Sequence, residues 1–230
     1  MVEVRKPKPV HSWGDLISEI GTIVLGVLIA LAAEQGVQML SWRHQVSEAR
    51  QAMRNELTDS AGSAYAYRVI FKCNARSLED LRAQLLKSGP AWKGRPVGYD
   101  ALFWSWDSSV WSTALASGTL THMPPGEMNA FASAYAFLPR FVERDAAGQD
   151  DAAELGLLGR DLSLADGMRG RMLAAVGRAE RRNWSSALLA KQFLERAATV
   201  GALPSDADRK QMDGFVGQPG DHCWTQSKTG

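Results

Sequence analysis

Two cysteines, Cys73 and Cys223, are the first candidates for chemistry in this chain. In an oxidising compartment such a pair forms a disulfide, which would fix the C-terminal tail to a helix near residue 73. The loop-entropy model gives roughly 5 kcal/mol for closing a loop of about 150 residues. In a reducing compartment the same residues are two unrelated buried thiols. The disulfide prediction therefore depends on where the domain is located.

Metal binding has weaker support. His222 and Cys223 are adjacent, and with Cys73 and either His44 or His122 they would supply the four ligands of tetrahedral zinc. The spacing of these residues matches no zinc motif. We therefore expect no metal and no other cofactor.

Catalytic motifs are missing from the sequence. The four histidines are scattered, and the chain contains no G-x-S-x-G, H-E-x-x-H or G-x-G-x-x-G motif and no P-loop. Two pairs of neighbouring acids, Glu143 with Asp145 and Asp150 with Asp151, are predicted to lie at solvated helix ends. The sequence thus predicts a protein that is not an enzyme. A hydrolase with a non-standard site around His122 is an alternative.

Composition excludes some classes of protein. The 230 residues are 45% hydrophobic and 22% charged, and the formal net charge of +1 is too small for a typical nucleic-acid-binding protein. A chain of this length and apolar content has enough residues to bury a core. We expect no nucleic acid among its partners.

An apolar segment near the N-terminus is the most distinctive element. Residues 20–33 read IGTIVLGVLIALAA, and extension to residues 16–40 gives a helix long enough to cross about 30 Å of hydrocarbon. Trp13 and Trp42 flank this helix, where interfacial aromatic side chains are favoured. Residues 16–40 are therefore predicted to form a transmembrane helix in the lipid bilayer. A cleavable signal peptide, suggested by an A-x-A pattern, and a buried core helix are the alternatives.

Two sets of residues are candidates for an interaction surface. Gly26, Ala30 and Ala33 give the apolar helix a surface of small residues, which a second helix could approach closely. Trp104 and Trp106 lie in an aromatic-rich stretch that forms either an exposed contact platform or part of the core. Two residues apart, they cannot both face inward from one helix, so one is exposed or the segment is not helical.

The spacing of apolar residues predicts an all-α fold, in which the transmembrane helix continues into a long amphipathic helix and is followed by a helical domain. A helix break is expected at residues 59–63, and later helices are expected at residues 172–179 and 184–200. Gly118 and Gly201 are expected to end helices. The predicted organisation is an N-terminal segment (1–15), a transmembrane helix (16–40), a stalk with long helices (41–87), a helical domain (88–216) and a C-terminal tail (217–230).

Two stretches resemble a family of bacterial single-pass inner-membrane proteins. The first begins EIGTIVLGVLIALAAEQ and is similar to the family's E-x-x-x-V-x-G-V-L-I-A-L membrane helix, although one more residue separates Glu19 from Val24 here. The second, SSVWSTALASGTL, resembles the family's W-x-x-A/L-x-x-S-G-x-L segment at Trp111, Ser117, Gly118 and Leu120. The resemblance implies a cytoplasmic N-terminus and a periplasmic helical domain. It implies no catalytic residue, and the balanced charges around the apolar segment do not set the orientation by themselves.

The expected function is that of a membrane-anchored, non-catalytic protein, an accessory or scaffold subunit of a bacterial envelope complex. Its partners would be the lipid bilayer and other membrane or periplasmic proteins, and the sequence does not set its oligomeric state. A periplasmic ligand-sensing domain that needs a partner for its output is the other alternative, besides the hydrolase.

Overall fold

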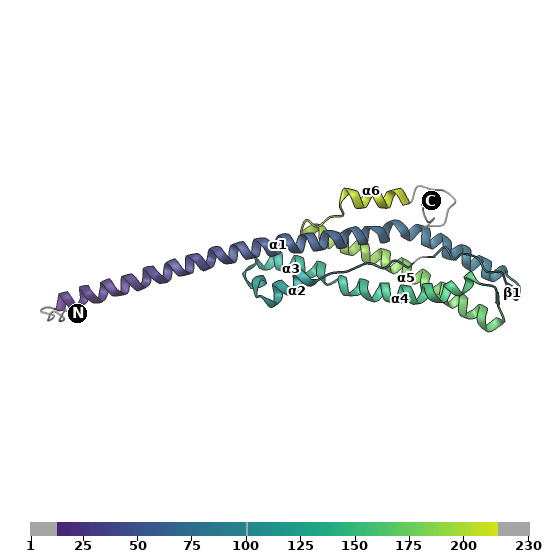
Figure 1. Ribbon diagram of the computed structural model, residues 1–230, viewed down its shortest axis with the longest axis horizontal. Coiled ribbons are helices and arrows are strands. Elements are labelled where there is room, and N and C mark those ends of the chain that lie inside the picture. The colour runs from purple at the N-terminus through teal and green to yellow at the C-terminus, as the bar shows by residue number, and fades with distance from the viewer. Residues whose placement is uncertain (1–12, 100, 216–230) are drawn as a thin grey trace, which may run out of the picture. The chain divides into compact units, whose positions relative to one another are not determined.

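Helices make up nearly all of the computed structural model, which describes residues 13–99 and 101–215 (Figure 1). The prediction of an all-α fold is confirmed. The chain divides into two units, residues 1–48 and residues 49–230. The elements are α1 (Trp13–Lys87), β1 (Ala91–Trp92), α2 (Ser109–Ala116), η1 (Thr119–His122), α3 (Pro125–Tyr135), α4 (Leu138–Gly156), η2 (Leu157–Gly159), β2 (Leu162–Ser163), α5 (Asp166–Thr199) and α6 (Asp206–Phe215).

The first unit contains the apolar part of α1. Among the described residues, α1 is the one helix that is long and apolar enough to cross a membrane by length and composition. None of its apolar window is buried within the chain. The large apolar side chains between Ile17 and Leu40 are 49–69% exposed, on every side of the helix. The prediction of a membrane-crossing helix is thus compatible with the structure in length, composition and exposure.

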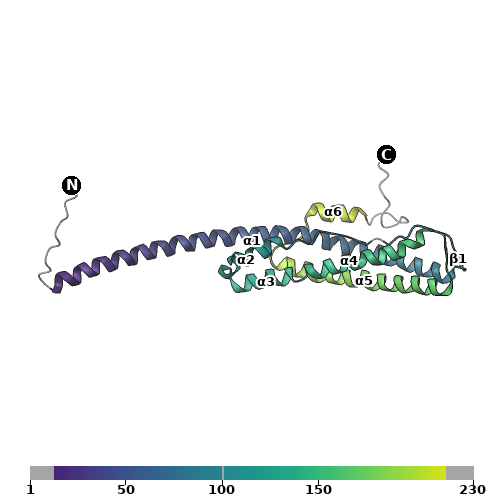
Figure 2. The same cartoon turned by 60° about the horizontal axis from the view of Figure 1, so that its bottom comes forward.

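The core of the second unit lies between the C-terminal half of α1, α4 and α5, which run side by side in both views (Figures 1 and 2). Phe141 of α4 and Phe193 of α5 are fully buried and meet edge to face, with ring centroids 5.7 Å apart. Helix α6 lies on the other side of α1, where Met212 packs against Ala66 and Ile70. Burial of these apolar faces is the main source of stability of such a bundle.

The predicted break in α1 at residues 59–63 is wrong, because the helix runs through to Lys87. Ser60 and Ala61 are buried, and a Cβ added at Gly62 would lie 2.8 Å from Oδ2 of Asp208. The small residues therefore allow α6 to approach α1 closely, and tertiary packing outweighs their weak helix propensity. The two helices expected at residues 172–179 and 184–200 are likewise one helix, α5.

A short antiparallel pair, which the sequence did not predict, joins the two long loops of the second unit. Ala91 of β1 pairs with Ser163 of β2, and Trp92 pairs with Leu162. The indole Nε1 of the buried Trp92 donates a 2.8 Å hydrogen bond to the carbonyl of Leu158. These contacts fix the loop after α1 against the loop after α4.

Gly94 provides a test of this loop contact. A Cβ added there would lie 2.6 Å from the carbonyl oxygen of Gly159 and 2.7 Å from Cα of Arg160, so backbone would have to move. Gly94→Ala is expected to lower the free energy of unfolding by roughly 1–3 kcal/mol. The matched control is Gly89→Ala, where nothing lies within 4 Å of the added Cβ. Urea denaturation of both variants measures the difference, and equal stabilities would contradict the close approach.

Candidate functional site

Asp145 is the centre of a buried polar cluster between α4, α1 and the segment before α2. Its side chain is 2% exposed. Oδ1 accepts a hydrogen bond from the hydroxyl of Tyr67, and Oδ2 accepts bonds from Nε1 of Trp106 at 2.8 Å and from the backbone N–H of Trp104 at 3.1 Å. The carboxylate therefore joins three separate parts of the second unit.

Burial dominates the electrostatics of this cluster. Desolvation raises the pKa of the Asp145 carboxyl above its ordinary value, although the hydrogen bonds from Tyr67, Trp106 and Trp104 act in the opposite direction. Burial, and then the bond to Asp145, raises the pKa of the Tyr67 hydroxyl, which stays protonated and able to donate. Because three donors occupy its two oxygens, the Asp145 carboxylate acts as an acceptor that holds the fold together.

Aromatic rings enclose the same carboxylate. The rings of Trp106 and Phe141 are stacked with centroids 4.0 Å apart, and Tyr67 stacks on both, 6.2 Å from Trp106 and 5.9 Å from Phe141. These rings exclude water from the carboxylate, which is the cause of its raised pKa.

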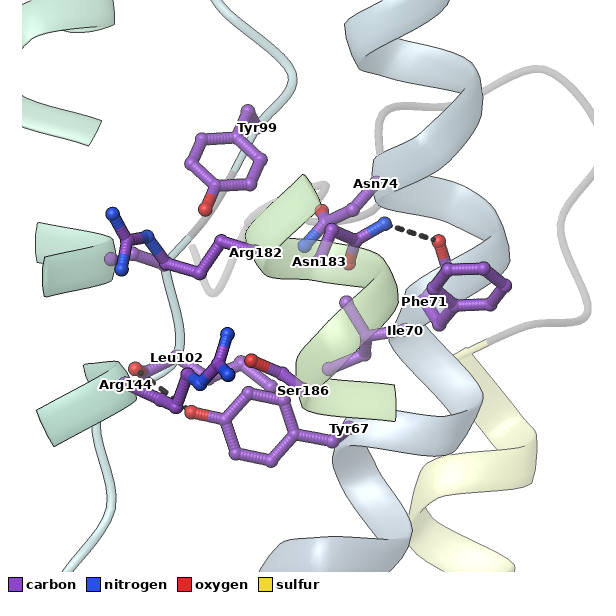
Figure 3. A pocket seen from close by; sticks show the side chains of 12 residues that line it. Tyr67, Ile70, Phe71, Asn74, Tyr99, Leu102, Arg144, Arg182, Asn183 and Ser186 are labelled. Carbon is purple, nitrogen blue, oxygen red and sulfur yellow. Dashed lines mark hydrogen bonds between the residues drawn. The ribbon is translucent and has the colours of Figure 1, made fainter. Parts of the chain in front are cut away.

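A small cavity adjoins this cluster and includes Tyr67 in its wall (Figure 3). Its lining comes from α1, from the segment around Leu102, from α4 at Arg144 and from α5 at Arg182 and Ser186. The cavity measures about 20 Å³. A water molecule needs roughly 10–15 Å³, whereas pockets for organic ligands measure about 300–1,000 Å³. The cavity therefore has room for one water or one small ion.

An ion-pair network between α4 and α5 lies next to the cavity. Asp151 is 3% exposed; Oδ2 accepts from Nε of Arg182 at 2.7 Å, and Oδ1 accepts from Nε of Arg178 at 3.2 Å. Arg178 also bonds to Glu154, which accepts from Nε of Arg171 at 2.7 Å. The hydrogen bond from Arg171 and the charge of Arg178 hold the pKa of Glu154 below its ordinary value. The network joins two helices through five alternating charges.

Polar contacts also attach α1 to α2 and α3. Glu56 accepts bonds from Ser109 Oγ and from the backbone N–H of Val110, both at 3.0 Å, at the start of α2. Its other oxygen accepts from the hydroxyl of Tyr135 at 2.6 Å, and burial, followed by this bond, raises the pKa of that hydroxyl. A carboxylate at a helix N-terminus satisfies backbone N–H groups that have no partner within the helix.

The candidate disulfide and the candidate small-residue surface both involve helix α1. Cys73 lies in α1 and is half-buried, whereas Cys223 lies outside the described residues, so their disulfide stays a prediction. Gly26, Ala30 and Ala33 lie on the exposed apolar part of α1. Nothing lies within 4 Å of a Cβ added at Gly26. Across residues 13–99 and 101–215, no group of three or more His, Cys, Asp or Glu side chains is arranged to hold a metal ion.

Trp104 and Trp106 differ in burial. Trp106 is 8% exposed and stacks on Phe141 inside the aromatic cluster. The prediction that Trp106 belongs to an exposed interaction surface is therefore wrong. Trp104 is half-buried against the cluster formed by Ala66, Ile70 and Leu102. Residues 101–108 are not helical, which is one of the two outcomes that the spacing of these tryptophans predicts.

Asp145 and Asp151 lie in a different environment from the one that the sequence predicts. Both were expected at solvated helix ends, and both are buried. A signal for their burial exists in α4, where the buried residues recur every three or four positions. They are Leu138, Phe141, Asp145, Gly148, Asp151 and Leu155. Periodicity therefore places both carboxylates on the core face of α4.

Comparison with known proteins gives no further information on the site. No family model matches the sequence, and neither a curated protein nor a solved structure shows a significant match.

Proposed function

We propose that this chain is a membrane-anchored, non-catalytic accessory or scaffold subunit of a bacterial envelope complex, acting through protein–protein contacts. The observation that carries the proposal is the exposure of α1 between residues 17 and 40. Large apolar side chains there are 49–69% exposed, and none of the apolar window is covered by the rest of the described chain.

A helix that is apolar on all sides is stable only where lipid or protein surrounds it. Burial of each such side chain is worth about 1.5–3 kcal/mol, so a dozen of them in water would drive association of the chain. The exposure of the segment favours the membrane over the core-helix alternative, because the apolar core clusters of the described residues lie in the second unit. A bilayer is the surrounding that fits both the length and the uniform apolarity of the segment.

The orientation in this proposal comes from the resemblance of residues 19–57 and 111–120 to bacterial inner-membrane proteins. That resemblance implies an N-terminus in the cytoplasm and a helical unit in the periplasm. The predicted disulfide between Cys73 and Cys223 would be consistent with that compartment.

The non-catalytic part of the proposal rests on how the buried acids are used. Asp145 and Asp151 are engaged by donors from other elements of the second unit, and Glu56 by donors from α2 and α3. Each of them joins elements that are far apart in the sequence. This arrangement supports a rigid helical body that presents its surface to partners.

Co-purification from native membranes tests the proposal. We expect the tagged full-length chain, extracted in mild detergent, to elute with other envelope proteins in a fixed stoichiometry that reciprocal tagging reproduces. Leu25→Arg with Leu28→Arg, each costing about 3 kcal/mol of insertion free energy, is expected to abolish both membrane association and the complex. The matched control carries arginines at the exposed Gln45 and Gln51 and should retain both.

A full-length chain that elutes alone under these conditions would contradict the assembly role. A double-arginine variant that remains in the membrane would contradict the anchor.

A further inference from the structure

Helices α4 and α5, which run side by side in both views, meet along an outward-facing seam (Figures 1 and 2). Arg144 of α4 bonds to Ser185 of α5 at one point of this seam. Further along, Phe137, which precedes α4, lines an open hollow with Gln192 and Arg196 of α5. Side chains three or four residues apart share a helix face, so the seam follows one stripe of residues on each helix. The stripes also contain Arg140 of α4 and Arg181 and Leu188 of α5.

The α4–α5 seam has an excess of positive charge. Arg140, Arg181 and Arg196 are exposed, and none of them pairs with an acid of residues 13–99 or 101–215. Two carboxylates flank the seam, and of these Glu195 pairs with the lysine one turn before it, at 3.9 Å, whereas Glu143 pairs with no described cation. The arginines nearer the start of α5 are all neutralised by Asp151 or Glu154; they are Arg171, Arg178 and Arg182.

Apolar side chains lie among these charges. Leu188 is 40% exposed, and Trp184, one turn earlier on α5, is 61% exposed. The ring of Phe137 is half-buried, and the guanidinium carbon of Arg140 lies 5.6 Å from its centroid. Aromatic residues and arginine are the types that protein–protein interfaces and their hot spots favour, with apolar contacts at the centre and polar groups at the rim. The seam combines these features on one exposed face.

We infer that the α4–α5 seam binds an amphipathic helix of a partner protein, which has apolar side chains on one face and carboxylates along both sides of that face. The inference rests on the proposed function and specifies the surface and the chemistry of the partner. A groove between two helices accepts a third helix because rows of side chains fit into it. From Arg181 to Arg196 the groove extends about 22 Å, roughly four helical turns. Carboxylates of the partner would pair with the exposed arginines.

A designed peptide tests this inference on the purified full-length chain in non-ionic detergent. The probe is a fluorescein-labelled, alanine-rich helix of about 20 residues, with leucines on one face and glutamates along both sides of that face. Its fluorescence anisotropy is expected to rise and saturate as the chain is added, and its apparent affinity is expected to fall as salt is added. A peptide with lysine in place of glutamate, and one with the same residues in scrambled order, should not bind.

Arg140→Glu with Arg181→Glu reverses two charges of the seam and is expected to weaken binding of the glutamate peptide about tenfold. Leu188→Ala removes an exposed apolar contact and should weaken it about threefold. The matched control reverses the charges of Arg68 and Arg76, which are exposed on α1, and should bind like the wild type. If the double seam variant does not fold, Leu188→Ala decides, because it only shortens an exposed side chain.

Three results would overturn the inference: no binding of the glutamate peptide, equal binding of the glutamate and lysine peptides, or equal binding by the wild type and the seam variants. Displacement of the peptide by phosphatidylglycerol in mixed micelles would show that the seam faces lipid headgroups, and would overturn it as well. The probe is not a natural partner, so this result is independent of the co-purification that tests the proposed function.

Discussion

Replacing Asp145 by alanine is expected to lower the free energy of unfolding by roughly 3 kcal/mol or more, because it leaves several buried donors without an acceptor. The donors are the hydroxyl of Tyr67, Nε1 of Trp106 and the backbone N–H of Trp104. Urea denaturation of the full-length chain in detergent, followed by tryptophan fluorescence, measures the loss. A destabilisation below about 1 kcal/mol, the usual range for a surface site, would contradict the role of this carboxylate.

Asp145→Asn is the matched variant. Its amide oxygen can keep the bonds from Trp104 and Trp106, and its amide nitrogen can donate to the hydroxyl of Tyr67, so the expected loss is much smaller than for alanine.

The difference in stability between the wild type and Asp145→Asn is expected to depend on pH with a defined sign. Since the pKa of Asp145 is raised in the folded state, the folded chain binds a proton at a higher pH than the unfolded chain. The wild type should therefore gain stability relative to Asp145→Asn as the pH falls through the raised pKa toward the ordinary aspartate value of about 3.9. Urea denaturation of both proteins over a pH series measures this difference. A difference that moves in the opposite direction would show that hydrogen bonding, and not burial, dominates.

Asp151→Ala is the second substitution with a large expected effect. It removes the partner of Arg182 and one of the two partners of Arg178, and leaves the charge of the half-buried Arg182 without its carboxylate. Loss of one partner from a fully buried ion pair costs about 3–5 kcal/mol, and we expect a smaller value of about 2 kcal/mol because Arg178 keeps Glu154 and both arginines keep contact with water. Urea denaturation of the wild type and Asp151→Ala at low and high salt measures this loss of unfolding free energy.

The control for Asp151 is Glu195→Ala. Glu195 pairs with Lys191 at 3.9 Å on the exposed face of α5, where an ion pair contributes at most about 0.5 kcal/mol and is screened by salt. Equal effects of the two substitutions would mean that the α4–α5 network does not stabilise the fold.

Local patterns were sufficient for the class of fold and for several helix ends. Gly118 and Gly201 both have positive φ, 75° and 77°, where a residue without a side chain is favoured, and they follow the ends of α2 and α5 as predicted. The apolar segment was evident from composition alone. These features depend on neighbouring residues, which is why the sequence reveals them.

The polar cluster could not be predicted in the same way. Asp145 meets Tyr67 from 78 positions away and Trp106 from 39 positions away, and no local pattern shows which acid finds such donors. The break expected at residues 59–63 failed for the same reason, since the contact of Gly62 with Asp208 is a tertiary one. The helical periodicity of α4 would have indicated that Asp145 and Asp151 face the core, but not their partners.

Photo-cross-linking in the native membrane tests most directly whether lipid surrounds residues 16–40. A benzophenone amino acid at Ile23, Leu25 or Leu31 samples three sides of the exposed apolar helix. At all three positions we predict adducts whose added mass is that of a phospholipid, while the same probe at the exposed Gln45 yields none. Lipid adducts on one side only, or none at any of the three positions, would contradict a helix that crosses the bilayer.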